Sequence, residues 1–203
     1  AGLMPSSAGQ VFFLGEPVIK PRKEIGYMLQ RDQLFEWRSI LRNTLLGPEI
    51  QHSSHKDKRK TRKTASEMLT RYDLGGFLGA KPSELSGGMR QRAAFARTVL
   101  TGSDLLLLDE PFSALDYLTR ISMREWLLEQ WEREKKTVLF ITHDVEEAVF
   151  LSSRILVVEE SPITHLRSID VPAEYPRSRD ELRKPEILSL KEELIGMLRK
   201  ETS

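Results

Sequence analysis

LLLLDEP, at residues 105–111, sets four leucines directly before two carboxylates, Asp109 and Glu110. A continuous apolar run of this length is typical of a parallel strand that is buried on both faces. Its carboxyl end would bring the two acids to the edge of the sheet where ligands bind in open α/β folds. The stretch therefore predicts an α/β protein with a ligand site at Asp109 and Glu110.

The chemistry of this acid pair has two interpretations. Asp109 and Glu110 could simply face solvent at the end of a strand. A carboxylate after four apolar residues also suits a Mg²⁺ site, and a second carboxylate beside it suits a base that polarises water. The pair alone does not decide between these interpretations.

Upstream of the acids, LSGGMRQR at residues 85–92 introduces a slim alanine-rich segment. Ser86 could merely cap a helix over 88–100, with Gly87 and Gly88 easing the turn. A hydroxyl and successive backbone N–H groups at the positive end of a helix also form a site for a phosphate. Both interpretations predict the helix, and only the second predicts an anionic ligand.

Downstream of the acids, SALD at residues 113–116 and THD at 142–144 follow in close order. His143 alone could be a surface-loop histidine, because Asp144 and Glu147 already form a capping box for a helix over 145–152. The combination of the four stretches in this order is harder to explain by chance than any one of them.

Together the four stretches resemble the nucleotide-binding subunit of an ABC transporter, and the resemblance runs over essentially the whole chain. LSGGMRQR is similar to the signature motif of that family, LLLLDEP to its Walker B strand, SALD to its D-loop and His143 to its switch histidine. Gln30 in YMLQRDQLF resembles the glutamine of the family's Q-loop. The implied fold is the α/β P-loop NTPase core of an ABC ATPase, with a mostly parallel sheet, a small antiparallel β-subdomain and a helical subdomain that carries the signature.

The resemblance implies ATP and Mg²⁺ as cofactors and an ATPase activity coupled to transport. Glu110 would orient and polarise the attacking water, and His143 would contact the γ-phosphate. Asp109 and Gln30 would hold Mg²⁺. The family's mechanism places two copies of the subunit around two ATP molecules in a sandwich dimer.

In that dimer the signature of one copy would close over the nucleotide of the other. The residues implied to bind nucleotide in this way are Ser86, Gly87, Gly88 and Gln91. Asp116 in the SALD stretch would communicate across the dimer interface.

The first residues resemble the family's segment that follows the P-loop helix. A G-x-x-x-x-G-K-S/T phosphate loop would then lie before Ala1, and no such pattern occurs in the 203 residues. We therefore expect an N-terminally truncated cassette that alone neither binds ATP tightly nor hydrolyses it. We also expect a strand to be missing from the sheet beside residues 105–108.

The sequence indicates one domain, residues 1–203, with four parts. We expect residues 1–30 to hold the end of the P-loop helix, the β-subdomain and the Q-loop strand, and 31–100 to form the helical subdomain with the signature. We expect residues 101–160 to form the core with the Walker B, D-loop and switch-histidine stretches, and 161–203 to form a C-terminal tail and helix.

The elements expected from periodicity and turn residues fall within these parts. A hairpin is expected over 10–19, strands over 25–29, 137–141 and 155–158, and further helices over 39–46, 118–134 and 187–200. The strand over 137–141 is expected to be buried.

Composition excludes several other classes of protein. A chain of 203 residues with 39% hydrophobic residues can bury a core, and a net charge of +1 argues against a globally electrostatic nucleic-acid binder. Without cysteine it has no disulfide framework and no thiolate metal site. No apolar run approaches a membrane span, so a transport role would require separate permease subunits.

The run HSSHKDKRKTRK, residues 52–63, is the one strongly basic stretch. It could bind nucleic acid or anionic lipid. Because Ala65, Met68, Leu69 and Tyr72 follow at helical spacing, we favour the outer face of an amphipathic helix. We interpret His52 and His55 as solvent histidines.

DEPFSALDYLTR and TVLFITHDVEEAVFLSSRILVV look most like the importer group for nitrate, sulfonate, taurine and vitamin precursors. This implies a second copy and transmembrane permease subunits as partners, a solute-binding protein indirectly, and a peripheral location at the cytoplasmic face of the cell membrane. Phe35 and Trp37 lie where such importers receive their permease and could be core or interface; we favour interface. The residues do not name the solute.

Two alternatives remain. A nucleotide-free truncated cassette could act as an assembly module. A non-transport ABC ATPase would need a coiled-coil insertion or a second cassette, and neither fits in 203 residues.

Overall fold

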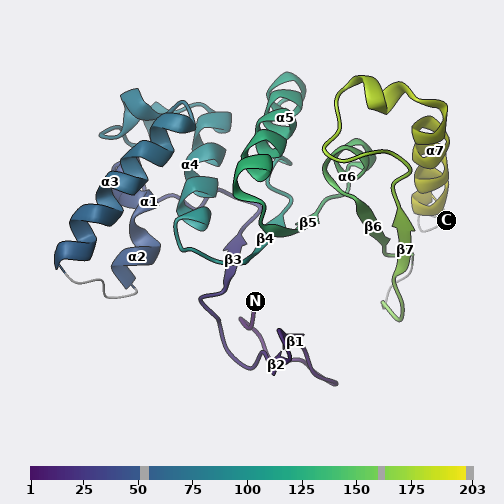
Figure 1. Ribbon diagram of the computed structural model, residues 1–203, viewed down its shortest axis with the longest axis horizontal. Coiled ribbons are helices and arrows are strands. Elements are labelled where there is room, and N and C mark those ends of the chain that lie inside the picture. Colours follow the sequence, from purple (N-terminus) through teal and green to yellow (C-terminus); the bar gives the residue numbers. More distant parts are fainter. Residues whose placement is uncertain (51–54, 160–162, 200–203) are drawn as a thin grey trace. The chain divides into compact units, whose positions relative to one another are not determined.

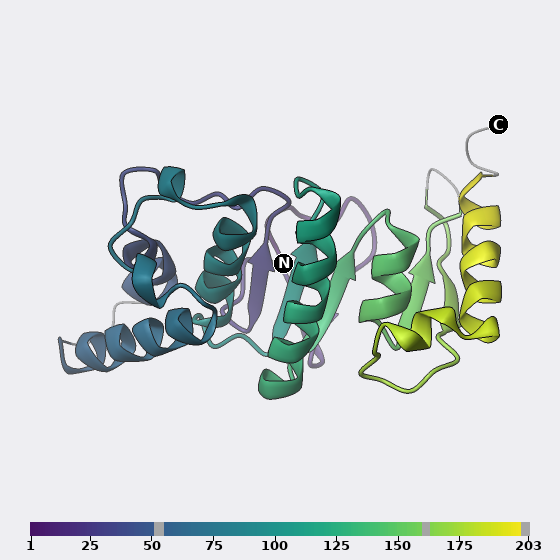
Figure 2. The same ribbon diagram turned by 90° about the horizontal axis from the view of Figure 1, so that it is seen from above.

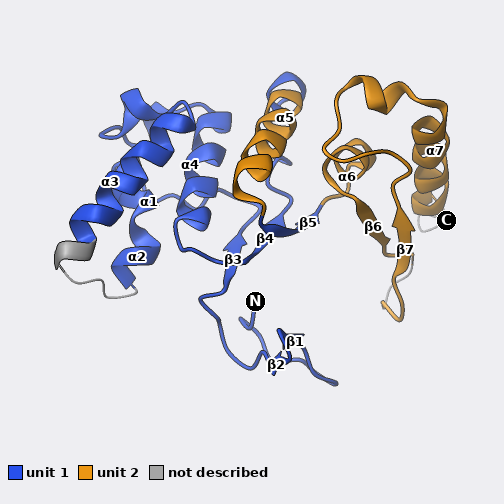
Figure 3. Cartoon of the chain, viewed as in Figure 1, with its two compact units in different colours: residues 1–120, 136–141 blue, residues 121–135, 142–203 orange. Residues whose placement is uncertain are grey.

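The computed structural model describes residues 1–50, 55–159 and 163–199 (Figure 1). It divides into two compact units, which are coloured separately in Figure 3. Unit 1 consists of Ala1–Arg120 and Lys136–Ile141, and unit 2 consists of Ile121–Lys135 and Thr142–Ser203. Each unit has its own sheet and is described by itself.

The sheet of unit 1 is parallel and has the order β3-β4-β5. β3 (Ile25–Met28), β4 (Leu105–Asp109) and β5 (Thr137–Ile141) pair in register, with Tyr27 opposite Leu107 and Leu107 opposite Leu139. LLLLD is therefore the central strand. The α/β fold class expected from the sequence is confirmed.

The expectation of a missing strand beside residues 105–108 is wrong, because β3 and β5 occupy both sides of β4. The expectation that 137–141 is a buried strand is wrong as well. Leu139 and Ile141 are 47% and 49% exposed, and β5 lies at the edge of its sheet. An apolar run indicates a strand but not how many of its faces are covered.

A two-residue pair of strands, β1 (Phe12–Phe13) and β2 (Glu16–Pro17), forms the expected hairpin in a shorter form. Leu14 and Gly15 make the turn, and both have positive φ, 52° and 80°. Glycine adopts such a φ without steric cost, which explains its place in this turn.

The helices of unit 1 gather into one bundle beside β3 (Figures 1 and 2). They are α1 (Ile40–Thr44), α2 (Leu46–Ile50), α3 (His55–Arg71) and α4 (Gly87–Val99). The single helix expected over 39–46 is two helices. Ser39 caps α1, and Pro48 falls in the first turn of α2, where a missing N–H is tolerated.

Helix α3 contains those residues of the basic run 52–63 that the structure describes. The side chains of Lys58, Arg59 and Lys60 are exposed, whereas Ala65 and Leu69 are fully buried. The amphipathic interpretation is confirmed for this part. His52 lies outside the described residues, as does the side chain of His55.

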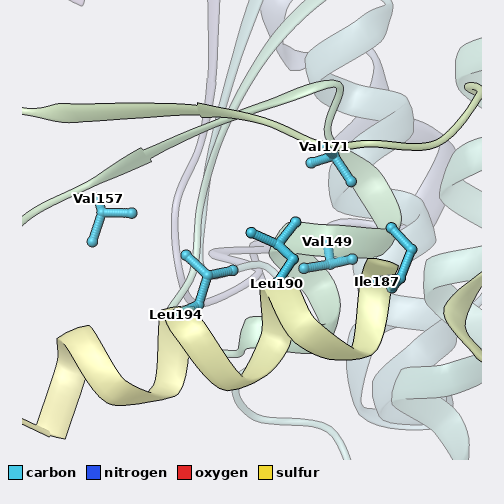
Figure 4. Close-up of a cluster of buried hydrophobic side chains, with 6 residues drawn as sticks. All are labelled: Val149, Val157, Val171, Ile187, Leu190 and Leu194. Atoms are coloured by element: carbon cyan, nitrogen blue, oxygen red, sulfur yellow. The ribbon is translucent and has the colours of Figure 1, made fainter. Parts of the chain in front are cut away.

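Unit 2 contains the larger part of α5 (Tyr117–Glu134), then α6 (Val145–Leu151) and α7 (Pro185–Arg199). Its sheet pairs β6 (Arg154–Val157) with β7 (Arg167–Asp170) in antiparallel fashion, and β7 was not expected from the sequence. Figure 4 shows its core. The cluster consists of Val149, Val157, Val171, Ile187, Leu190 and Leu194.

Within the described ranges, no helix combines the length and the apolar character needed to cross a membrane.

Candidate functional site

The end of β4 is the centre of the candidate site. β4 closes at Asp109, and the backbone N–H of Glu110 donates to the carbonyl of Ile141 at 2.9 Å, so the pairing with β5 extends one residue further. Glu110 then adopts a φ of 42°. A residue other than glycine seldom has a positive φ, and such strain costs about 1 to 3 kcal/mol. The chain turns sharply here, with the N–H of Ser113 bonded back to the carbonyl of Glu110.

Asp109 is held by a tyrosine on the neighbouring strand. The Tyr27 hydroxyl donates to Oδ2 of Asp109 at 2.9 Å. Tyr27 pairs with Leu107, so its ring lies on the sheet face that Asp109 shares two residues further on. The hydrogen bond to the carboxylate raises the pKa of the Tyr27 phenol, because ionisation would break the bond and set two negative charges side by side.

Glu110 is held by Gln30, two residues beyond β3. Nε2 of Gln30 donates to Oε2 of Glu110 at 3.0 Å. The structure thus brings three of the expected site residues, Gln30, Asp109 and Glu110, to one edge of the sheet in unit 1.

The segment after Gln30 is tied to α4 by two arginines. Arg90 Nε donates to Oδ2 of Asp32 at 3.1 Å. Arg97 donates to the carbonyls of Asp32 and Gln33 at 2.6 and 2.7 Å. Burial lowers the pKa of the Arg97 guanidinium, opposed by the nearby charge of Asp32. The position of residues 31–33 is therefore coupled to the helix that carries the LSGG stretch.

Helix α4 begins as the sequence predicts. The Ser86 hydroxyl accepts from the N–H of Met89 at 3.3 Å and caps the helix. Ser86 is exposed and Gly87 half-buried, whereas Gly88 is buried and Gln91 is 3% exposed. A Cβ on Gly87 would lie 3.1 Å from a methyl of Leu115, so the SALD stretch packs closely on this turn.

Asp116 ends the SALD stretch and is exposed. Its Oδ1 accepts from the N–H of Thr119 at 3.0 Å, which makes it the cap of α5. Hydrogen bonding from Thr119 lowers the pKa of the Asp116 carboxyl. Asp116 therefore stays charged at the start of this helix.

His143 belongs to unit 2, where it is exposed in the loop between β5 and α6. Asp144 caps α6, with Oδ1 accepting from the N–H groups of Glu146 and Glu147 at 2.8 and 3.1 Å. In a capping box the Glu147 side chain would accept a hydrogen bond from the N–H of Asp144. Here that N–H donates to Thr142 Oγ1 at 3.0 Å.

The oxygen ligands at the end of β4 fit a magnesium ion. Among residues 1–50, 55–159 and 163–199, no cluster of three or more His, Cys, Asp or Glu side chains could cage a metal by itself. Mg²⁺ commonly keeps several waters and takes one or two carboxylates plus substrate phosphates. Asp109 would supply the carboxylate and the Gln30 amide a further oxygen.

Comparisons with known proteins assign the chain to a family. The family model described as ABC transporter matches residues 1–113. The chain is 43% identical over 190 residues to the formylaminopyrimidine import ATP-binding protein ThiZ of Halalkalibacterium halodurans, covering 93% of this chain and 75% of that protein. The chain belongs to the ABC transporter family. It is an ATP-binding subunit of that family.

Two further likenesses support this assignment. The taurine import ATP-binding protein TauB of Rhizobium johnstonii is 39% identical over 203 residues, which cover 98% of this chain and 76% of TauB. The fold matches the ATP-binding cassette MJ0796, solved as a dimer in a post-hydrolysis state with ADP and Pi. The TM-score is 0.64 at 25% identity, over 85% of this chain and 78% of that chain.

The hydrogen bonds that Tyr27, Arg90 and Arg97 make in this ABC ATP-binding subunit were not predicted from the sequence. A signal for Tyr27 did exist, since a side chain at the third position of β3 shares a face with alternate residues of β4. No comparable signal exists for Arg90 and Arg97, because their partners Asp32 and Gln33 lie in an irregular segment whose position no strand register predicts.

Proposed function

We propose that this chain is the ATP-binding and ATP-hydrolysing subunit that powers an ABC importer of a small solute. The observation that carries the proposal is the pairing of Gln30 with Glu110 and of Tyr27 with Asp109 at the end of β4. The names of the relatives, import ATP-binding proteins for formylaminopyrimidine and taurine, support the importer class.

In the proposed reaction Glu110 is the base. Its carboxylate, already an acceptor for Gln30, polarises and orients the water that attacks the γ-phosphate of ATP. The positive φ of Glu110 ends the extended backbone of β4 at this residue. Catalysis of phosphoryl transfer is mainly positioning and electrostatics, so a fixed carboxylate is the main requirement here.

Asp109 and Gln30 would hold Mg²⁺, which when bound neutralises developing phosphate charge. Asp109 is oriented for this by the Tyr27 hydroxyl. Gln30 donates to Glu110, and Arg90 and Arg97 link the residues after Gln30 to α4. Occupancy of the site would thereby be transmitted to the signature helix.

His143 would contact the γ-phosphate and steady the transition state. In a sandwich of two copies, Ser86, Gly87 and Gly88 would close over the partner's γ-phosphate, and Asp116 would communicate across the interface. The exposed hydroxyl of Ser86 and the exposed carboxylate of Asp116 are available for such contacts. The buried side chain of Gln91 would instead support the helix from inside. The dimeric state of MJ0796 supports the arrangement by analogy.

The partners proposed are transmembrane permease subunits, with a solute-binding protein acting indirectly. The subunit would then be peripheral, at the cytoplasmic face of the cell membrane. Trp37 is 71% exposed and stacks on Phe35 with ring centroids 4.8 Å apart, which supports a contact surface there. The solute would resemble those of the importer relatives, such as a sulfonate, taurine or a vitamin precursor.

The 203 residues by themselves should bind ATP weakly, because they contain no G-x-x-x-x-G-K-S/T loop. Charge-assisted hydrogen bonds are worth roughly 1.5 to 3 kcal/mol each, so the loss of the several that such a loop makes to phosphate removes most of the binding free energy. A ligand with micromolar affinity has only about 8 kcal/mol in total. Isothermal titration of the 203-residue chain with Mg-ATP should give no tight binding, and a dissociation constant below about 10 µM would contradict this.

The activity itself is tested by joining the P-loop segment of TauB to this chain and measuring ATP turnover. We expect Mg²⁺-dependent hydrolysis that disappears on chelation. Absence of both nucleotide binding and hydrolysis would favour the nucleotide-free assembly module over an ATPase. Pull-down from native membranes should recover a permease. Recovery of ribosomes or DNA instead would exclude a role in transport.

A further inference from the structure

Arg124 lies in α5, within unit 2, and is almost completely buried, at 5% exposure. Its guanidinium contacts three carboxylates at the start of α6. Nη2 lies 2.6 Å from Oδ2 of Asp144 and 3.5 Å from Oε1 of Glu147, and Nη1 lies 3.2 Å from Oε2 of Glu146. A planar fork of donors is suited to bridging several carboxylates at once.

The same carboxylates are bonded to the loop that carries His143. The Thr142 hydroxyl donates to Oε2 of Glu147 at 2.6 Å and accepts from the N–H of Asp144 at 3.0 Å. Thr142, Arg124, Asp144, Glu146 and Glu147 form one connected set, which we call the Arg124 network. The residues immediately before and after His143 both belong to it.

The charges explain why the network depends on Arg124. Three carboxylates close to one helix end repel one another, and Glu147 is 3% exposed, so water cannot stabilise it. Of these three carboxylates, Lys191 contacts Glu146, with Nζ lying 3.4 Å from Oε1. Arg124 is the cation that contacts all three.

We propose that Arg124 is a positioning residue that fixes the loop of His143 through the Arg124 network. The consequence for catalysis rests on the proposed function, in which His143 contacts the γ-phosphate. The structural half of the proposal does not depend on nucleotide. Removing the guanidinium releases the carboxylates, loosens Thr142 and Asp144, and lets His143 leave its position.

The test uses amide hydrogen exchange by NMR on the 203-residue chain. In Arg124→Gln, exchange at the N–H groups of Asp144, Glu146 and Glu147 should accelerate by about tenfold or more, equivalent to about 1.4 kcal/mol. Arg124→Lys keeps the charge but not the fork, and should accelerate exchange less. The ring ¹⁵N signals of His143 should shift in both variants.

The matched control is Arg154→Gln, which removes an arginine of the same unit whose ion pair with Asp170 is exposed. It should leave the loop amides and the His143 signals unchanged. Should Arg124→Gln fail to fold, Arg124→Lys and Thr142→Val carry the test, because Thr142→Val breaks the loop's bonds to Glu147 and Asp144 without unpairing a buried charge.

Two results would overturn the proposal. In one, exchange at the loop amides rises only in step with the amides of α7, which would mean general destabilisation. In the other, the loop amides accelerate but the His143 ring signals do not move, which would reduce Arg124 to a support for α6. Failure of the proposed function has a different signature, namely a P-loop-joined protein that shows no Mg²⁺-dependent ATP turnover although Arg124 still fixes the His143 loop.

Discussion

The end of β4 in unit 1 and the His143 loop in unit 2 are held by different interactions. Asp109 accepts a hydrogen bond from the Tyr27 hydroxyl and Glu110 accepts one from the Gln30 amide, and both donors are neutral groups. The loop is held by a buried arginine that contacts three carboxylates. Because their acceptors are charged carboxylates, the bonds from Tyr27 and Gln30 contribute about 1.5 to 3 kcal/mol each, and in the loop the donor carries a charge as well.

This difference matches what the two regions are proposed to do. Carboxylates that are proposed to bind a metal ion and a water need oxygens that neutral donors orient without cancelling the negative charge. A histidine loop that must meet a phosphate at one geometry needs a fixed backbone. Variants that remove single groups from each region test whether the division holds.

The largest effect is expected for Glu110→Gln in the P-loop-joined protein. The amide keeps the shape but loses the negative charge that polarises water, so turnover should fall by about 100-fold or more while ATP binding persists. Steady-state ATPase assays and nucleotide titration measure the two quantities. Asp104→Asn, an exposed acid of the same unit, is the control. Turnover close to that of the control would remove Glu110 from the catalytic role.

Arg97→Met should give the next largest effect, on stability. It removes the donor to the carbonyls of Asp32 and Gln33, and we expect a loss of about 2 to 3 kcal/mol in the free energy of unfolding. Urea unfolding measures it, with the exposed Arg59→Met as control. An unchanged midpoint would mean that the coupling of residues 31–33 to α4 is energetically unimportant.

Tyr27→Phe should weaken the binding of Mg²⁺ rather than change the action of Glu110 as a base. Because an orienting hydrogen bond to a metal ligand is lost, the Mg²⁺ concentration that half-activates turnover should rise about tenfold. Tyr117→Phe, an exposed tyrosine, should behave as the parent. If Tyr27→Phe lowers maximal turnover at saturating Mg²⁺ instead, its hydroxyl serves something other than Asp109.

The smallest effect concerns Tyr175 in unit 2 and is confined to high pH. Burial raises the pKa of its phenol to about 12. Because the folded pKa lies above the unfolded value of about 10, the stability that the protonated phenol contributes is present below about pH 10 and lost as the pH rises towards 12. Melting temperatures should therefore fall less steeply over this window in Tyr175→Phe than in Tyr117→Phe. Parallel curves would contradict the assignment.

The local elements were predictable because their signals lie within a few residues. Ser86 and Asp144 mark the starts of α4 and α6, and the leucine run marks β4. The site residues Gln30, Asp109 and Glu110 followed from motif resemblance, and the structure brings them together.

What the sequence could not provide depends on contacts between distant residues. The exposure of Leu139 on β5 depends on what covers the sheet, which an apolar pattern does not specify. The division into two units and the pairing of β7 with β6 depend on tertiary packing. Arg124 looks like any charged residue of a helix until its partners 20 to 23 residues away are known.

We propose that two copies of this subunit enclose ATP, with the signature stretch of one copy closing over the nucleotide that the other copy holds. Light scattering on the P-loop-joined Glu110→Gln protein, with and without Mg-ATP, tests it most directly. We predict a monomer without nucleotide and a dimer with Mg-ATP, because binding persists while hydrolysis cannot reopen the sandwich. A protein that binds Mg-ATP with unchanged affinity and remains a monomer would contradict the proposed sandwich dimer.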